Sequence, residues 1–271
     1  MSKKKPDVIS LKQRKQERAP RPPLFTKDRL IKAAVCAVAG TLLFLSCADF
    51  DIWPLAWFSV APLLAVALDP TTKKPAIYGF ITGLFANGGG FYWIVPFLQR
   101  FGHLPLIAAI PIFLLLVSYQ AITFSVFAWA VRRLDDRFGV GVTLLAPVVY
   151  VACEMVVPYV FPWYLAITQA WVRPVIQIAD LTGPLGVSFL LVLCNGALYD
   201  AWAAWRAKKP LPMPRLAVAV GLIAMSLGYG LVRINQVTHA RAAAPKLNVG
   251  VVQANIGIQE KWHPQLAQSQ L

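Results

Sequence analysis

Long apolar blocks alternate with short polar segments along most of the chain, and each block is about as long as a membrane-spanning helix. Crossing a hydrocarbon core of about 30 Å takes about 20 apolar residues in a helix. Seven blocks fit this length: 30–48, 52–68, 76–98, 104–131, 142–160, 185–205 and 216–232. The pattern therefore predicts an all-α polytopic membrane protein with about seven transmembrane helices.

The basic residues predict how these helices are oriented. Of the 26 Lys and Arg residues, 20 lie in segments that alternate connections place on one side of the membrane: 1–32, 69–75, 132–141 and 206–215. The other side receives six. Lys and Arg near the ends of spans are retained in the cytoplasm. We therefore expect a cytoplasmic N-terminus with a basic tail over residues 1–29, a transmembrane helical domain over residues 30–233, and an extracytoplasmic C-terminal segment.

Composition supports the membrane class and limits the other classes. Apolar residues make up 58% of the chain and charged residues 14%, whereas soluble domains have about 45–50% and about 25%. The net charge of +14 suggests nucleic acid, but contact with anionic membrane lipid accounts for basic residues beside spans. We predict membrane lipids as partners and no nucleic acid. The four cysteines show no metal-ligand spacing, so neither a metal nor a cofactor is predicted.

The C-terminal segment changes character. Residues 246–253 are apolar and rich in valine, which predicts a buried strand. A single strand is not stable alone, because its backbone groups and apolar face need neighbours. We expect residues 234–271 to form a linker and the start of an extracytoplasmic domain whose remainder does not follow in this sequence.

Several unusual residues fall in the predicted outer half of the membrane. The third block contains Asn87 and three glycines before Phe91, and each glycine weakens a helix by about 1 kcal/mol relative to alanine. The segment either packs tightly through small residues or forms a kink that lines a cavity.

The fifth block carries an acidic residue and ends in an aromatic loop. Glu154 is the acidic residue well inside a predicted span, and such a group is either functional or a hydrogen-bonded structural carboxyl. The loop at 158–164 holds two prolines and four aromatic residues. It fits an aromatic belt at headgroup depth or the mouth of a lipid-binding cleft.

Three segments together resemble the bacterial apolipoprotein N-acyltransferases. The first runs over residues 79–105 as GFITGLFANGGGFYWIVPFLQRFGHLP, the second comprises Glu154, FPWY at 161–164, Gln169, LTGPLGVSFL at 181–190 and Asn195, and the third is VQANIGIQEKW at 252–262. The chain departs from the family pattern at 155–157, where Met-Val-Val replaces Trp-Leu-Arg, and at Val160, where glycine is usual.

The resemblance implies a function and a fold. The family transfers an acyl chain from a phospholipid, through a cysteine thioester, to the N-terminal amine of the diacylglyceryl-cysteine of an apolipoprotein. Its Glu–Lys–Cys triad belongs to an extracytoplasmic nitrilase-like α/β domain, and residues 246–262 would be the first strand and motif of that domain. The triad has no counterpart in this sequence, so we expect this chain alone to be inactive. The implied location is the bacterial inner membrane, with the C-terminal segment in the periplasm.

The candidate site residues therefore bind lipid and do not include a catalytic residue. The implied partners are a phospholipid acyl donor, a diacylglyceryl apolipoprotein and membrane lipids. One alternative is a non-catalytic scaffold that works with a separate nitrilase-like chain; a small transporter is disfavoured because the spans show no internal repeat. The candidate substrate and lipid-binding residues are Trp262, Glu154, Phe161, Trp163, Tyr164, Gln169 and Trp93.

Overall fold

The computed structural model describes residues 26–47, 49–253 and 257. The chain divides into two compact units, residues 1–234 and 235–271. Helices account for the regular structure, and no strand occurs in the described part of the chain. Residues 246–253 are exposed and irregular, so the predicted nitrilase-like strand is not confirmed.

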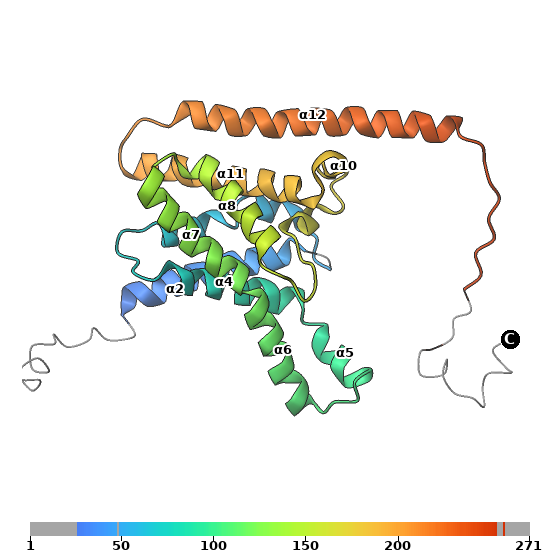
Figure 1. Ribbon diagram of the computed structural model, residues 1–271, viewed down its shortest axis with the longest axis horizontal. Helices are drawn as coiled ribbons and strands as arrows, with labels where there is room; N and C mark the ends of the chain where they lie inside the picture. Colours follow the sequence, from blue (N-terminus) through green and yellow to red (C-terminus); the bar gives the residue numbers. More distant parts are fainter. Residues whose placement is uncertain (1–25, 48, 254–256, 258–271) are drawn as a thin grey trace, which may run out of the picture. The chain divides into compact units, whose positions relative to one another are not determined.

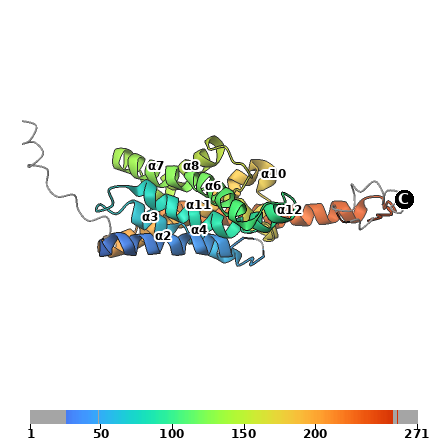
Figure 2. The ribbon, with the colours of Figure 1, turned by 90° about the horizontal axis from the view of Figure 1, so that it is seen from below.

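Five helices form the packed core of the first unit (Figures 1 and 2). They are α2 (Lys27–Leu45), α4 (Pro75–Gly90), α7 (Ile122–Phe138), α8 (Val142–Val156) and α11 (Pro184–Arg206). Neighbouring members of this series pack against one another in that order. Phe124, Phe127 and Tyr150 are fully buried where α7 meets α8, because large rings fill the space between helices at low entropic cost.

Glycines on α4 allow its neighbours to approach closely. A Cβ at Gly79 would collide with the Phe124 carbonyl, one at Gly83 with Ala121, and one at Gly89 with the Phe44 ring. Small residues bring helix backbones together in this way in membranes. In the segment after Asn87, Gly89 packs closely in this way, whereas Gly88 and Gly90 have only ordinary van der Waals neighbours. The helix α4 continues without a break to Gly90, so these glycines do not form a kink within it.

Three predicted apolar blocks are divided in the structure. The block at 52–68 becomes the 3₁₀ helix η1 (Trp53–Trp57) and the short helix α3 (Ala61–Ala67). The block at 76–98 becomes α4, a turn, and α5 (Ile94–Arg100). In the block at 104–131, α6 (Leu106–Gln120) is followed by α7 after Ala121.

The remaining elements are short, except for the last. They are η2 (Leu165–Gln169), α9 (Arg173–Ile176), α10 (Ala179–Thr182) and α12 (Met213–Ala243). Three stretches of the described residues are long and apolar enough to cross a membrane: Leu106–Phe138, Pro184–Arg206 and Met213–Ala243. The chain is a helical membrane protein, and the total of seven spans stays a prediction.

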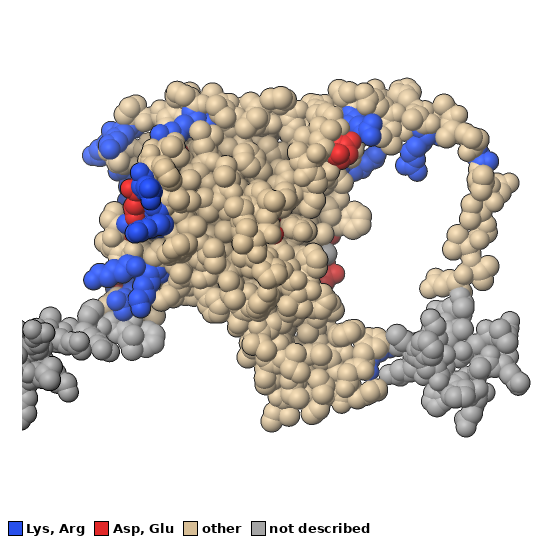
Figure 3. All heavy atoms as spheres, in the orientation of Figure 1, with Lys and Arg blue, Asp and Glu red and all other residues tan. Residues whose placement is uncertain are grey.

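Lys and Arg gather at one end of the core, over the starts of α2 and α4 and the ends of α7 and α11 (Figure 3). We call this the basic end. Asp200 of α11 caps α8 there, accepting hydrogen bonds from the backbone N–H of Val142 at 3.3 Å and from both the N–H and hydroxyl of Thr143 at 3.0 and 2.7 Å. A carboxylate stabilises a helix N-terminus because it meets unpaired N–H groups and the positive end of the helix dipole.

Candidate functional site

A line of aromatic rings lies at the end of the core opposite to the basic end. We call it the aromatic strip, and its members are Phe91, Trp93, Phe97, Phe101 and Phe161. The strip begins where α4 ends, whereas the basic loop precedes α4. A helix of 16 residues separates these points by about 24 Å, most of the thickness of a hydrocarbon core.

The strip joins two segments that are far apart in sequence. The rings of Trp93 and Phe161 meet edge to face with centroids 5.9 Å apart, and Phe161 lies 6.0 Å from Phe91. Trp93 is nevertheless 42% exposed and Phe161 39% exposed. The structure thus brings together two residues that the sequence predicted as lipid contacts, and it leaves each ring partly exposed.

The end of α6 holds the aromatic loop in place. The Gln120 side-chain amide donates to the Phe161 carbonyl at 2.9 Å, and its oxygen accepts from the Val160 N–H at 3.3 Å. The Tyr119 hydroxyl donates to the Pro158 carbonyl at 2.8 Å. Sequence reasoning missed Gln120, although a buried amide within an apolar block is a signal that it binds backbone groups.

Glu154 supports the same loop from the other side. It is only 3% exposed, and its Oε1 accepts from the Leu165 N–H at 2.8 Å. The other oxygen, Oε2, is buried and has no hydrogen-bond partner among the described residues. The structure shows that Glu154 forms a hydrogen bond at the start of η2, and its role as a lipid-binding residue stays a prediction.

Gln169 connects the two 3₁₀ helices. Its amide nitrogen donates to the Trp53 carbonyl at 3.1 Å, and its oxygen accepts from the indole N–H of Trp57 at 3.1 Å. Gln169 is fully buried, so it does not contact lipid directly. It instead pairs with the Trp53 carbonyl, a backbone group of the kind that irregular structure leaves open inside a membrane protein.

Trp163 and Tyr164 face inwards. The ring of Trp163 is 6.4 Å from Phe124 of the core, and Tyr164 is 5.9 Å from Tyr159. Both pack partly buried against the core. Among the predicted lipid contacts, these two therefore differ from Trp93 and Phe161, while Trp262 lies outside the described residues.

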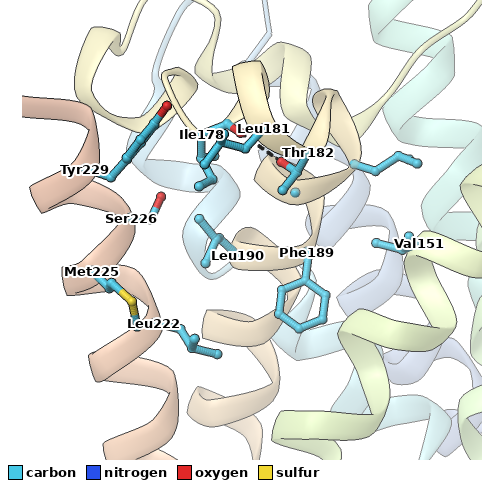
Figure 4. Close-up of a pocket in the computed structure, with 12 residues that line it drawn as sticks. Val151, Ile178, Leu181, Thr182, Phe189, Leu190, Leu222, Met225, Ser226 and Tyr229 are labelled. Carbon is cyan, nitrogen blue, oxygen red and sulfur yellow. Dashed lines mark hydrogen bonds between the residues drawn. The ribbon is translucent and has the colours of Figure 1, made fainter. Parts of the chain in front are cut away.

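A second feature is an apolar cavity of about 530 Å³ between α8, α10, α11 and α12 (Figure 4). Its size falls within the range of about 300–1,000 Å³ that is usual for ligand sites. Leu181, Phe189 and Leu222 are among its walls. The hydroxyl of Ser226 is buried without a partner in the described part of the chain. Sequence reasoning missed this cavity because its apolar residues do not differ from ordinary helix-packing residues.

One wall of this cavity is fixed by charge. Asp180 accepts from the Tyr229 hydroxyl at 2.6 Å and from the Arg233 guanidinium at 2.7 Å. The hydrogen bond from Tyr229, followed by the bond and charge of Arg233, lowers the pKa of Asp180 below its usual value, although burial slightly opposes ionisation. The ionised carboxylate therefore links α10 to α12.

The comparisons with known proteins agree with this membrane architecture. Residues 39–197 match the family described as the apolipoprotein N-acyltransferase N-terminal domain. This range contains α4, the aromatic strip, Glu154 and Gln169. The chain belongs to the apolipoprotein N-acyltransferase family.

Individual relatives with the name apolipoprotein N-acyltransferase extend the match over most of the chain. The protein of Geobacter metallireducens is 35% identical over 236 residues, 85% of this chain and 44% of the relative. The protein of Vibrio parahaemolyticus is 27% identical over 241 residues, 87% of this chain and 46% of the relative. The protein of Rhodopirellula baltica is 32% identical over 238 residues, which cover 78% of this chain and 38% of the relative. The chain thus spans less than half the length of these relatives.

Proposed function

We propose that this chain forms the membrane platform of a lipoprotein N-acyltransferase and holds lipid chains at the aromatic strip. The lipids would be a phospholipid acyl donor and the diacylglyceryl group of an apolipoprotein. The observation that carries the proposal is the pair Trp93 and Phe161, which pack together and yet remain about two-fifths exposed. Family membership supports the class of lipid substrate.

The chemistry of the strip supports binding. Its five side chains are aromatic and contain no nucleophile, acid or base. Exposed rings at headgroup depth contact the upper part of acyl chains and the glycerol region. The proposal therefore gives the strip the task of orienting lipid, and the acyl-transfer step belongs to the family's Glu–Lys–Cys triad.

The supports behind the strip fit this task. Gln120 binds the backbone of the loop at Val160 and Phe161, and Glu154 binds the backbone of Leu165, directly after the loop. A binding surface made by a loop is accurate only when neighbouring groups fix its backbone. We infer that these two residues position the loop and do not contact lipid.

The test is lipid cross-linking combined with activity in cells. The double variant Trp93→Ala/Phe161→Ala should reduce cross-linking by a phospholipid with a photoactivatable acyl chain in nanodiscs. Each lost aromatic contact is worth about 1 kcal/mol, so the loss of two rings should reduce cross-linking by about thirtyfold. The same change at the matching positions of a full-length relative, expressed in cells depleted of their own enzyme, should lower the fraction of triacylated lipoprotein measured by mass spectrometry.

The matched control is Trp205→Ala, because Trp205 is a strongly exposed tryptophan on α11 near the basic end. This variant should keep both cross-linking and lipoprotein triacylation. Equal losses in the control and the double variant, or no loss in either, would show that the strip does not select lipid.

A further inference from the structure

A groove of about 530 Å³ lies between the first turns of α2 and α4, at the basic end. The two helices run in the same direction from this end, since the Thr82 hydroxyl donates to the Cys36 carbonyl and Gly89 packs on Phe44. The groove therefore has an upper rim at the helix starts and lower walls that lie a turn or two deeper. This location is separate from the aromatic strip, which follows the other end of α4.

The rim and the lower walls of the groove differ in chemistry. The lower walls are mainly apolar and consist of Leu30, Ala33, Ile77, Tyr78 and Ile81. The upper rim is polar and basic and consists of Thr26, Asp28, Arg29, Thr71, Thr72, Lys73 and Lys74. Leu30 and Ile77 are more than half exposed. The groove therefore changes from apolar walls to a basic rim within two helical turns. These surfaces complement a molecule that carries an acyl chain below an anionic group.

Two acidic groups near the rim share one cation. Lys32 pairs with Asp28 at 3.1 Å and with Asp69 at 3.5 Å. In contrast, Lys73 and Lys74 form no ion pair within the described residues, and both are exposed. The positive charge of Lys73 and Lys74 therefore exceeds the one carboxylate charge that Lys32 leaves over.

A buried hydroxyl adds a second, independent signal. Thr72 lines the groove and is only 6% exposed, and its Oγ1 has no hydrogen-bond partner in the described part of the chain. A buried unpaired polar group is costly, so it indicates a missing acceptor or donor. The N-terminus of α4, which begins at Pro75 without a side-chain cap, presents the positive end of a helix dipole beside it.

We propose that this groove binds one anionic phospholipid from the membrane leaflet at the basic end. The phosphate lies against Lys73, Lys74 and Thr72, and one acyl chain lies along Leu30 and Ile77. Basic pockets between transmembrane helices on the cytoplasmic side commonly hold anionic headgroups. A soluble anion would use the rim alone and leave the apolar walls unused, and an apolar chain without a phosphate would leave the lysines unpaired.

The test is native mass spectrometry of the full chain released from detergent with added lipid. The wild type should retain phosphatidylglycerol more strongly than phosphatidylcholine with the same acyl chains. Lys73→Gln/Lys74→Gln should weaken phosphatidylglycerol binding roughly tenfold, because each cation near an anionic lipid contributes substantially. Thr72→Val, which keeps the shape of the side chain, should weaken it by a smaller factor.

The control is Lys208→Gln/Lys209→Gln. These two lysines are also adjacent, exposed, at the basic end and followed by proline, but they lie outside the groove. This variant should bind phosphatidylglycerol like the wild type. Equal weakening by both double variants would overturn the proposal in favour of diffuse charge attraction. Displacement of the lipid by millimolar inorganic phosphate, or equal binding of the two lipids, would overturn it as well.

Discussion

The polar interior and the aromatic strip use their most distinctive residues in opposite ways. In the interior, Asn195, Gln169 and Glu154 are buried and bind backbone groups. In the strip, Trp93 and Phe161 are apolar and partly exposed. The difference shows that a buried polar residue in a membrane protein can have a partner within the protein itself. The buried polar groups here maintain the fold, and the exposed rings are available to ligands.

The physical reason is the lack of water in hydrocarbon. Backbone N–H and C=O groups that are not paired within a helix need partners from the protein itself. The break between η1 and α3 leaves such groups, and Asn195 binds four backbone groups in all: the N–H groups of Val60 and Ala61, both at 2.8 Å, and the carbonyls of Ala56 at 3.0 Å and Leu191 at 2.8 Å.

The largest effect on stability is expected at this amide. Asn195→Leu removes two acceptor and two donor bonds at a fully buried position, and should lower the free energy of unfolding by about 3–5 kcal/mol. The measurement is denaturant unfolding in detergent micelles. Cys194→Ala, at the neighbouring and less buried position, should cost much less. A similar loss in both variants would mean that α11 is sensitive to any change.

Substitutions of Glu154 should lower the free energy of unfolding by less. Two variants should separate the contribution of the charge from that of the hydrogen bond. Glu154→Leu leaves the buried Leu165 N–H without its acceptor and should cost about 2–3 kcal/mol. Glu154→Gln keeps an acceptor oxygen at the same place, so its stability should stay within about 1 kcal/mol of the wild type. If the glutamine variant were as unstable as the leucine variant, the negative charge itself would be required.

The extent to which sequence predicts this structure depends on whether a feature is local. The apolar blocks predicted helices because membrane-length runs of apolar residues reflect local composition, and α2, α8, α11 and α12 lie on four of them. The break after Trp57 was not predicted, since Asn195, which compensates it, lies 135 residues from Val60. The contact between Trp93 and Phe161 also depends on how distant segments meet.

The directions of the aromatic side chains in the candidate site could not be predicted from the sequence either. Sequence indicated the aromatic loop at 158–164 as a whole, but the structure divides it into exposed and inward-facing residues. Phe161 points to the strip, whereas Trp163 packs on Phe124. Neighbouring aromatic residues in an irregular loop have no fixed periodicity, so their directions follow from tertiary anchors such as Gln120 and Glu154.

A single truncation in the strip should change stability less than a truncation in the core. Trp93→Ala removes a ring that is 42% exposed, and the expected cost is about 1 kcal/mol. Phe124→Ala removes a ring that is almost completely buried, and it should cost about 3–5 kcal/mol. Unfolding of both variants under the same conditions tests the comparison, and a Trp93 variant as unstable as the Phe124 variant would make the strip part of the core.

The smallest effect is expected where charge links α10 to α12. Because the Tyr229 and Arg233 bonds lower the pKa of Asp180 in the folded state, the stabilisation is present above the unfolded pKa of about 3.9. It is lost as pH falls through the lower folded value. Thermal unfolding of the wild type and Asp180→Asn should therefore differ slightly at pH 7, and the difference should disappear towards a pH of about 3 or below. Since other carboxylates titrate equally in both proteins, only this difference reports on Asp180. If the difference in Tm between the wild type and Asp180→Asn stayed constant across this pH range, the aspartate would act through packing and not through its charge.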